Sequence, residues 1–219
     1  MLLSRTISEI IAFALIALIA MDIHEFAHAY VANLMGDTTA RDMGKMTLDP
    51  RVNINWVGWL MWAFLGFGIL GSVPVNARRM RDPRWGELAA VAAGPFSNLL
   101  LAAVFAIFIR LGIAQPDLSF SRQQIFPTLD QIVTIGVFLN LLMFLFNLLP
   151  FFPFDGWTIM LRLVPPDLAY TLQRHQQTST LIFFGCLALS ILGVFDIFGR
   201  VLYPPLGLLF QLLTGYRLF

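Results

Sequence analysis

The chain has 219 residues, of which 58% are hydrophobic and only 12% are charged, and its net charge is +1. Ordinary soluble domains carry about 25% charged residues, so the composition excludes a soluble globule, and its hydrophobicity excludes a disordered chain. The single cysteine excludes an internal disulfide framework and a multi-cysteine metal cluster. The charge balance provides no basic tract for nucleic acid. We therefore expect an all-α polytopic membrane protein that forms one domain over residues 1–219.

Apolar segments that approach the length of a membrane span, about 20 residues, recur along the chain. The sequence predicts five to six membrane segments. In chain order they are Ile7–Leu34, Ile54–Val75, Glu87–Ile109, Ile132–Phe152, Ser179–Phe198 and the shorter Val201–Leu213. The last of these has Pro204 and Pro205 near its start, which predicts a partial span.

Charge indicates how these spans are oriented. The connection Asn76–Trp85 holds four arginines against a single aspartate, and the positive-inside rule places such a connection in the cytoplasm. The third predicted span then runs outward and the fourth runs inward. The polar connection Pro165–Thr178 is therefore expected on the cytoplasmic side as well.

The first predicted span contains the motif His24-Glu25-Phe26-Ala27-His28. Residues four apart lie on one face of a helix, so the two imidazoles can bind one metal ion. Glu25 lies beside them and can take a proton from a metal-bound water, as in zinc hydrolases. The alternative is that the two histidines only line a contact between helices. Because ionisable groups in an apolar span are costly unless they serve a site, the motif favours a zinc site.

Zinc in a hydrolase has three protein ligands and an open position for water, so a third ligand must come from elsewhere. Asp155 is the best candidate, because it follows a long apolar span and lies among helix breakers. Pro150 and Pro153 interrupt the helix, and Gly156 permits an unusual turn. Non-helical backbone at membrane depth is tolerated where it lines a cavity. The alternative, a solvated helix end at the interface, has equal weight on spacing alone.

Two asparagines in apolar spans have two interpretations. Asn98 and Asn147 could bind substrate backbone or a developing oxyanion. They could instead form the hydrogen bonds between helices that are common for asparagine in membranes. For Asn98 the second interpretation is favoured from the residues alone.

Three motifs in a fixed order add a specific resemblance. They are His24–His28, the Ala-Gly-Pro-x-x-Asn element that ends at Asn98, and the Asn-x-x-Pro-x-x-Pro-x-Asp-Gly element over Asn147–Gly156. Together they resemble the site-2 protease family of intramembrane zinc metalloproteases. The resemblance extends over about Met21–Gly156, and it is to the compact branch without a PDZ or CBS domain.

The resemblance implies a role for each matching residue. His24, His28 and Asp155 would ligate one Zn²⁺ per chain. Glu25 would be the general base that activates water and later protonates the leaving amine. Asn98 and Asn147 would assist substrate binding or the oxyanion. A metalloprotease core would then occupy about residues 7–156, with additional C-terminal membrane segments over 157–219.

One departure from the family pattern lies in the loop after the first motif. Relatives often carry a histidine and an aspartate shortly after Asp-Pro, whereas Asp49-Pro50 leads here to Asn53 and Asn55. An auxiliary role of that pair in handling metal or substrate is therefore not expected in the usual form.

The family also bears on topology, because its HExxH motif lies toward the cytoplasmic side. Since a helix rises about 1.5 Å per residue, His24 would lie about 25 Å from a start near Ile7, which places the N-terminus outside the cytoplasm. The segment Ile54–Val75 must then re-enter or form a hairpin, and its four glycines fit this. If that segment crosses fully, the N-terminus flips and the active site moves toward the outer face. The absence of a targeting segment favours a prokaryotic plasma membrane.

The resulting expectation is an enzyme of regulated intramembrane proteolysis. Its partners would be a transmembrane protein or peptide substrate, the lipid bilayer and a regulatory membrane protein. The rival class is a non-proteolytic metal-binding protein or carrier that uses the same histidines and aspartate. Glu25 discriminates between them, because a carrier has no need of a base at that position.

Overall fold

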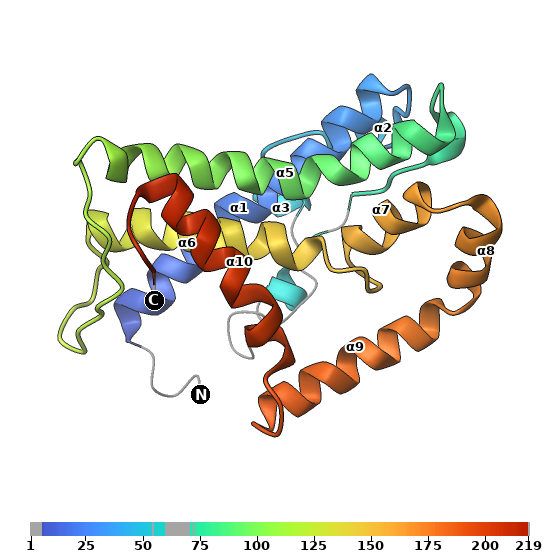
Figure 1. Ribbon diagram of the computed structural model, residues 1–219. Coiled ribbons are helices and arrows are strands. Elements are labelled where there is room, and N and C mark those ends of the chain that lie inside the picture. Colours follow the sequence, from blue (N-terminus) through green and yellow to red (C-terminus); the bar gives the residue numbers. More distant parts are fainter. Residues whose placement is uncertain (1–5, 54, 60–70, 72, 219) are drawn as a thin grey trace.

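The computed structural model describes residues 6–53, 55–59, 71 and 73–218 (Figure 1). Apart from an isolated bridge at Gly71, the secondary structure in this part of the chain is helical. The helices are α1 (Ile7–Leu34), α2 (Thr39–Asp42), α3 (Pro50–Asn53), η2 (Ala77–Arg79), α5 (Pro83–Arg110), α6 (Leu129–Asn147), α7 (Asp155–Leu163), α8 (Pro166–Arg174), α9 (Gln176–Ile191) and α10 (Ile197–Thr214). This confirms the all-α fold.

Four of the described helices are long and apolar enough to cross a membrane: α1, α5, α6 and α10. The C-terminal boundaries differ from those predicted. The predicted span Ser179–Phe198 is instead the 16-residue helix α9, because the chain turns at Gly193, whose φ is +71°. A new helix then begins after Asp196, whose side chain accepts a hydrogen bond from the Gly199 amide. The predicted partial span Val201–Leu213 lies inside this 18-residue helix, which includes both prolines.

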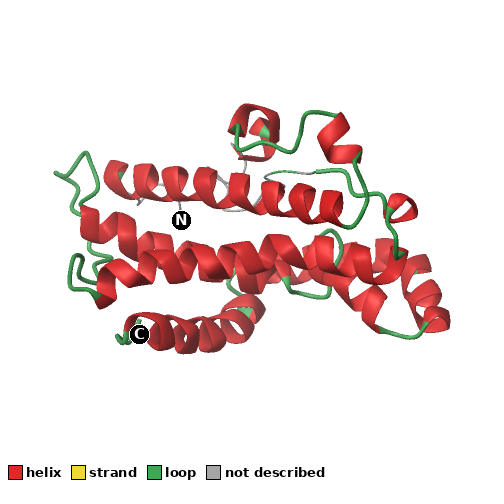
Figure 2. Cartoon of the chain, turned by 90° about the horizontal axis from the view of Figure 1, so that it is seen from above, coloured by secondary structure: helices red, strands yellow, loops and turns green. Residues whose placement is uncertain are grey.

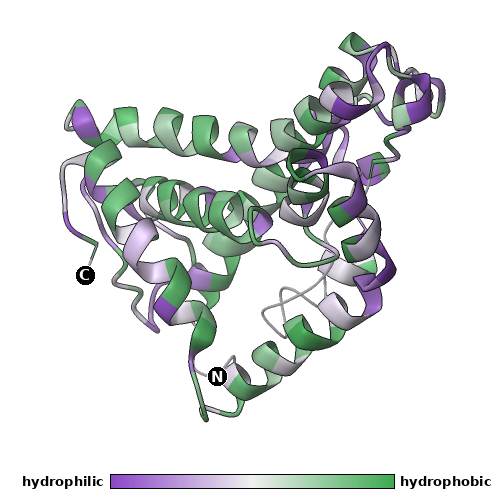
Figure 3. Ribbon diagram, turned by 45° about the vertical axis from the view of Figure 1, so that its right-hand side comes forward, coloured by the Kyte–Doolittle hydropathy of each residue, from purple (hydrophilic) through white to green (hydrophobic). Residues whose placement is uncertain are grey.

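The core is a bundle in which α1, α5 and α6 pack along their length, with α10 against α5 and α6 (Figure 2). Alanines on α1 and α5 lie at these contacts, where they are almost fully buried against larger residues of α6 and α10. Small residues let membrane helices approach closely, which strengthens van der Waals packing where lipid provides no hydrophobic drive. Hydrophilic residues gather at the end that carries α2 (Figure 3).

Hydrogen bonds at the two ends of the bundle fix the relative direction of the spans. The Arg81 amide donates to the carbonyl of Met35, 3.0 Å away, so α1 ends where α5 begins. At the opposite end, Arg110 donates to the carbonyls of Leu212 and Leu213 at the end of α10. The connection between α1 and α5 therefore starts and finishes at the same end of the bundle. The predicted re-entrant segment Ile54–Val75 cannot be followed along its length, because residues 54, 60–70 and 72 lie outside the described part.

The helix α7 is attached to the start of α5 by two arginines. Arg84 donates from Nε to the carbonyl of Arg162, at 2.8 Å, and from Nη2 to that of Val164, at 3.2 Å. These carbonyls end α7, where backbone acceptors lack partners within the helix. Arg162 in turn forms an ion pair with Glu87 on α5. Both contacts hold α7 along α5, which brings the start of α7 toward the middle of the bundle.

Candidate metal centre

The helix α1 places two histidines on one buried face. His24 and His28 are four residues apart and only 2% and 7% exposed. His24 is ten residues before the end of α1, so it lies about 15 Å from that end at 1.5 Å per residue. The two side chains are therefore inside the bundle, well below the end that bears the arginines.

The third candidate metal ligand, Asp155, comes from the start of α7. The helix α6 ends at Asn147 and α7 begins at Asp155, so the break predicted from the prolines is present. Gly156 lies directly against the end of α6, where a Cβ atom would be 2.4 Å from the carbonyl oxygens of Leu148 and Leu149. Only glycine fits such a contact with backbone, and this contact brings Asp155 next to the two histidines.

Three potential ligand atoms form a compact triangle. The Nε2 atoms of His24 and His28 are 3.0 Å apart, and Oδ2 of Asp155 lies 3.1 Å from the first and 3.3 Å from the second. A zinc ion bonded tetrahedrally at 2.0–2.2 Å requires ligand atoms about 3.3–3.6 Å apart. The triangle is therefore slightly smaller than one face of a zinc coordination tetrahedron and needs only a small expansion to become one.

Hydrogen bonds on the far side of each imidazole determine which nitrogen is free. The Nδ1 atom of His24 is 2.7 Å from Oδ1 of Asn98, and Nδ1 of His28 is 2.9 Å from the carbonyl of Ala90. Both partners are acceptors, so each Nδ1 carries the hydrogen and each Nε2 presents a lone pair. Oδ2 of Asp155 is buried without a hydrogen bond. Three lone pairs about 3 Å apart repel one another unless a cation lies among them, so this donor set fits Zn²⁺.

The amide of Asn98 cannot be flipped, which secures the assignment for His24. Asn98 donates from Nδ2 to the carbonyl of Ala20 and to Oδ1 of Asn140, both at 3.1 Å. Asn140 is fixed in turn, because its Nδ2 donates to the carbonyl of Gly136 at 2.8 Å. The Oδ1 atom of Asn98 is thereby directed at His24. Such partners orient metal-binding histidines and select their tautomer.

Gly94 on α5 faces the two imidazoles directly. A Cβ atom there would lie 2.3 Å from Nε2 of His28 and 2.7 Å from Nε2 of His24. The missing side chain therefore leaves the space next to the ligand atoms open. The predicted motif that ends at Asn98 thus contributes two features: an open surface at Gly94 and an oriented amide one turn later.

Glu25 lies beside the triangle on the neighbouring face of α1 and is 3% exposed. The backbone of Gly71 packs on it, since a Cβ there would be 2.8 Å from both Cγ and Oε1 of Glu25. Its carboxylate also lies near the backbone of Val73 and near the charged groups of the two histidines and Asp155. A base is thus held next to the candidate metal position.

The other predicted site residues lie elsewhere. Asn147 is half-buried at the end of α6, and its Nδ2 donates to the carbonyl of Met143 at 3.0 Å. Asn53, which follows Asp49-Pro50, is buried and donates to Oδ1 of Asp22 at 3.2 Å. Asn55 is exposed and accepts from the Gly58 amide.

Sequence reasoning missed two contributors, Asn140 and the carbonyl of Ala90. The first had a signal, because a polar amide in the middle of an apolar span requires a partner. The second had none, since any backbone carbonyl of α5 could have served.

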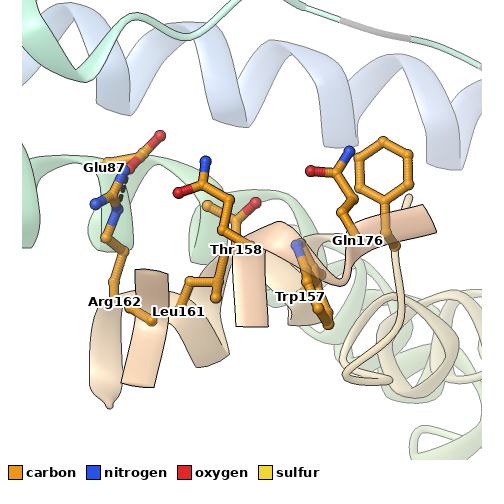
Figure 4. Close-up of a pocket in the computed structure, with 9 residues that line it drawn as sticks. Glu87, Trp157, Thr158, Leu161, Arg162 and Gln176 are labelled. Atoms are coloured by element: carbon orange, nitrogen blue, oxygen red, sulfur yellow. Dashed lines mark hydrogen bonds and ion pairs between the residues drawn. The ribbon is translucent and has the colours of Figure 1, made fainter. Parts of the chain in front are cut away.

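A cavity of about 140 Å³ lies along α7 beyond the metal centre (Figure 4). Its lining includes the Glu87–Arg162 ion pair, together with Trp157 and Thr158, which follow Asp155 in sequence. Gln176 closes it from α9. The three candidate ligands are not among its lining residues, so this cavity is a neighbour of the metal centre and not the centre itself.

Comparisons with known proteins relate the chain to zinc metalloproteases. The chain is 35% identical over 191 residues to a Bacillus subtilis (strain 168) protein named "Putative zinc metalloprotease YwhC", and the match covers 87% of this chain and 83% of that protein. No family model matches the chain, and no solved structure matches it. At this identity and coverage, the chain belongs to the zinc metalloprotease family that includes YwhC, which is consistent with its resemblance to compact site-2 proteases.

Proposed function

We propose that this metalloprotease acts inside the membrane, hydrolysing a peptide bond in or near the transmembrane segment of a membrane-protein substrate. One observation carries the proposal: three lone pairs converge within 3.3 Å of one another in the bundle, and a buried carboxylate lies beside them. Peptide hydrolysis by zinc requires this set, with a fourth position open to water.

Each residue has a distinct task in this proposal. His24, His28 and Asp155 would hold the zinc ion, which when bound supplies the Lewis acidity that lowers the pKa of water and polarises the scissile carbonyl. Glu25 takes the proton from the attacking water and delivers it to the amine of the leaving peptide. Asn98 keeps the Nδ1 hydrogen on His24 through its 2.7 Å hydrogen bond.

We assign the substrate-facing amide to Asn147 and not to Asn98. The polar atoms of Asn98 are committed to His24, Ala20 and Asn140 inside the bundle, and its side chain is fully buried. Asn147 is half-buried, at the end of the span that precedes Asp155. An amide in that place can reach the backbone of a bound peptide.

The substrate must be locally unwound, because the peptide groups of a transmembrane helix are hydrogen-bonded internally. We therefore propose substrates with helix-weakening residues near the cut. The backbone at Gly71 packs on Glu25, and an extended peptide could pair beside it as an added strand. Such pairing would hold the unwound segment next to the base.

The proposed location is a prokaryotic plasma membrane with the centre toward the cytoplasm. The arginines of the 76–84 connection lie at the end of the bundle nearer His24, and the positive-inside rule assigns that end to the cytoplasm. A regulatory membrane partner would provide the selection of substrate.

Cleavage of defined peptides in liposomes tests the proposal. Zinc-loaded wild type and Glu25→Gln are each reconstituted with two transmembrane peptides, one with a central Gly-Pro pair and one of uninterrupted leucine, and the products are identified by mass spectrometry. We expect wild type to cut the first peptide faster than the second and Glu25→Gln to lose at least 100-fold in rate while retaining zinc. Equal cutting of both peptides would refute the unwinding requirement. Zinc transport that persists in Glu25→Gln, with no cleavage by wild type, would instead indicate a carrier.

A further inference from the structure

The phenylalanine next to Asp155 is held by a cluster of aromatic rings. Phe154 immediately precedes the candidate ligand, and its ring centroid lies 4.7 Å from that of Phe146 on α6 and 4.8 Å from that of Phe183 on α9. Both contacts are edge-to-face, a geometry favoured by aromatic quadrupoles. Phe183 is only 4% exposed and also packs against Phe198 of α10, at 5.4 Å. It is therefore the ring through which α9 contacts the segment that carries Asp155.

A hydrogen bond from the same face of α9 reaches the same segment. The amide of Phe152 donates to Oγ of Ser179, 3.2 Å away, and Ser179 is buried. Ser179 and Phe183 are four residues apart, so they lie on one face of the helix. One contact precedes Pro153 and the other follows it, so α9 holds the turn on both sides of the proline.

Among the described residues, the main packing partners of α9 lie outside the catalytic part of the bundle. It packs mainly against α10 and α8, and Figure 1 shows it lying away from α1 and α5. Neighbouring side chains such as Leu181 are 74% exposed. The face with Ser179 and Phe183 therefore connects α9 to the turn before Asp155.

We propose that Phe183 and Ser179 are positioning residues for Asp155, so that the position of α9 against the preceding turn determines the affinity of the chain for zinc. This inference rests on the proposed zinc centre. The reason is geometric: metal–ligand distances tolerate deviations of only about 0.2 Å, and Asp155 begins a helix whose preceding turn is irregular. The two histidines are fixed within α1 and need no such support. Asp155 is the ligand that loosens when α9 is displaced.

Zinc affinity measured against a chromophoric chelator tests the inference on the full chain in detergent. The variants are Ser179→Ala and Phe183→Ala, with Leu181→Ala as the matched control on the exposed side of the same helix. Ser179→Thr keeps a hydroxyl and serves as the rescue variant. We expect a loss of about 10- to 100-fold for the first two, the range seen when supporting partners of metal ligands are removed, and at most a twofold change for Leu181→Ala and Ser179→Thr.

A double-mutant cycle separates positioning from general damage to the fold. If Phe183 acts through Asp155, Phe183→Ala has no further effect on the weaker zinc binding that His24 and His28 retain in Asp155→Ala, titrated at high zinc concentration. Cobalt(II) provides a second measurement, because its visible spectrum reports the geometry of the ligands, and Ser179→Ala should reduce the tetrahedral absorption.

Three results would overturn the inference. The first is wild-type zinc affinity in Ser179→Ala and Phe183→Ala. The second is a loss of zinc affinity on Phe183→Ala that is as large in the Asp155→Ala background as in wild type. The third is a loss of zinc affinity in Leu181→Ala as large as that in Phe183→Ala. Absence of zinc binding by wild type would overturn the metal centre itself, so the two failures are distinguishable.

Discussion

Substituting Gly94 by alanine adds one methyl group at the point where α5 faces both histidines. Its Cβ would lie 2.3 Å from Nε2 of His28, 2.4 Å from Cε1 of the same ring and 2.7 Å from Nε2 of His24. Non-bonded heavy atoms are comfortable at about 3.5 Å or more. The ring of His28 or the axis of α5 must therefore move by about 1 Å, several times the 0.2 Å that a metal site tolerates.

Loss of one ligand in this way should reduce zinc affinity by at least about 100-fold, or about 2.7 kcal/mol. Competition with a chromophoric zinc chelator measures it. The matched control is Gly185→Ala on α9, where a Cβ would meet no atom within 4 Å and the backbone is helical. We expect Gly185→Ala to bind zinc like wild type and to be slightly stabilised, by up to about 1 kcal/mol. Wild-type affinity in Gly94→Ala would refute this description of the centre.

Three further predictions concern the supports of the centre. Asn98→Ala removes the acceptor that keeps His24 in its ligating tautomer, so zinc affinity measured by chelator competition should fall about 10- to 100-fold; an unchanged affinity would contradict the tautomer argument. Gly156→Ala places a Cβ 2.4 Å from two backbone carbonyls, so the melting temperature and zinc content should both fall, and retention of both would show that α7 can shift freely. At Asp37, burial raises the pKa, but hydrogen bonds from Thr39 and the Asn76 amide more than offset it and hold the pKa below its usual value. A depressed carboxyl pKa stabilises the fold above the unfolded value of about 3.9 and loses that effect as pH falls through the folded pKa. The difference in thermal stability between wild type and Asp37→Asn should therefore be full at pH 7 and shrink below about pH 4; a constant difference would refute it.

The parts of the site that depend on local geometry were predictable. His24 and His28 meet because residues four apart share a helix face, whatever the rest of the chain does. The break before Asp155 followed from two prolines and a glycine. Whether that aspartate faced the histidines did not follow, since this depends on contacts between distant residues. These are Gly156 against the end of α6 and Arg84 against the end of α7.

The task of Asn98 was also beyond the reach of pattern alone. An amide can bind a substrate, orient a ligand or link two helices, and only the direction of its hydrogen bonds decides among these. Here that direction is set by Asn140 and the carbonyl of Ala20, both of which lie on other helices. At the C-terminus, a turn at Gly193 divided a stretch that reads as one continuous apolar segment.

Bound zinc per chain tests the central claim most directly, measured by elemental analysis of detergent-purified wild type, Asp155→Ala and Glu25→Gln. Three converging lone pairs predict about one zinc in wild type and its loss in Asp155→Ala. Zinc should be retained in Glu25→Gln, because Glu25 lies beside the three ligands and is not one of them. Absence of zinc from wild type, or zinc binding that is indifferent to Asp155, would contradict the account.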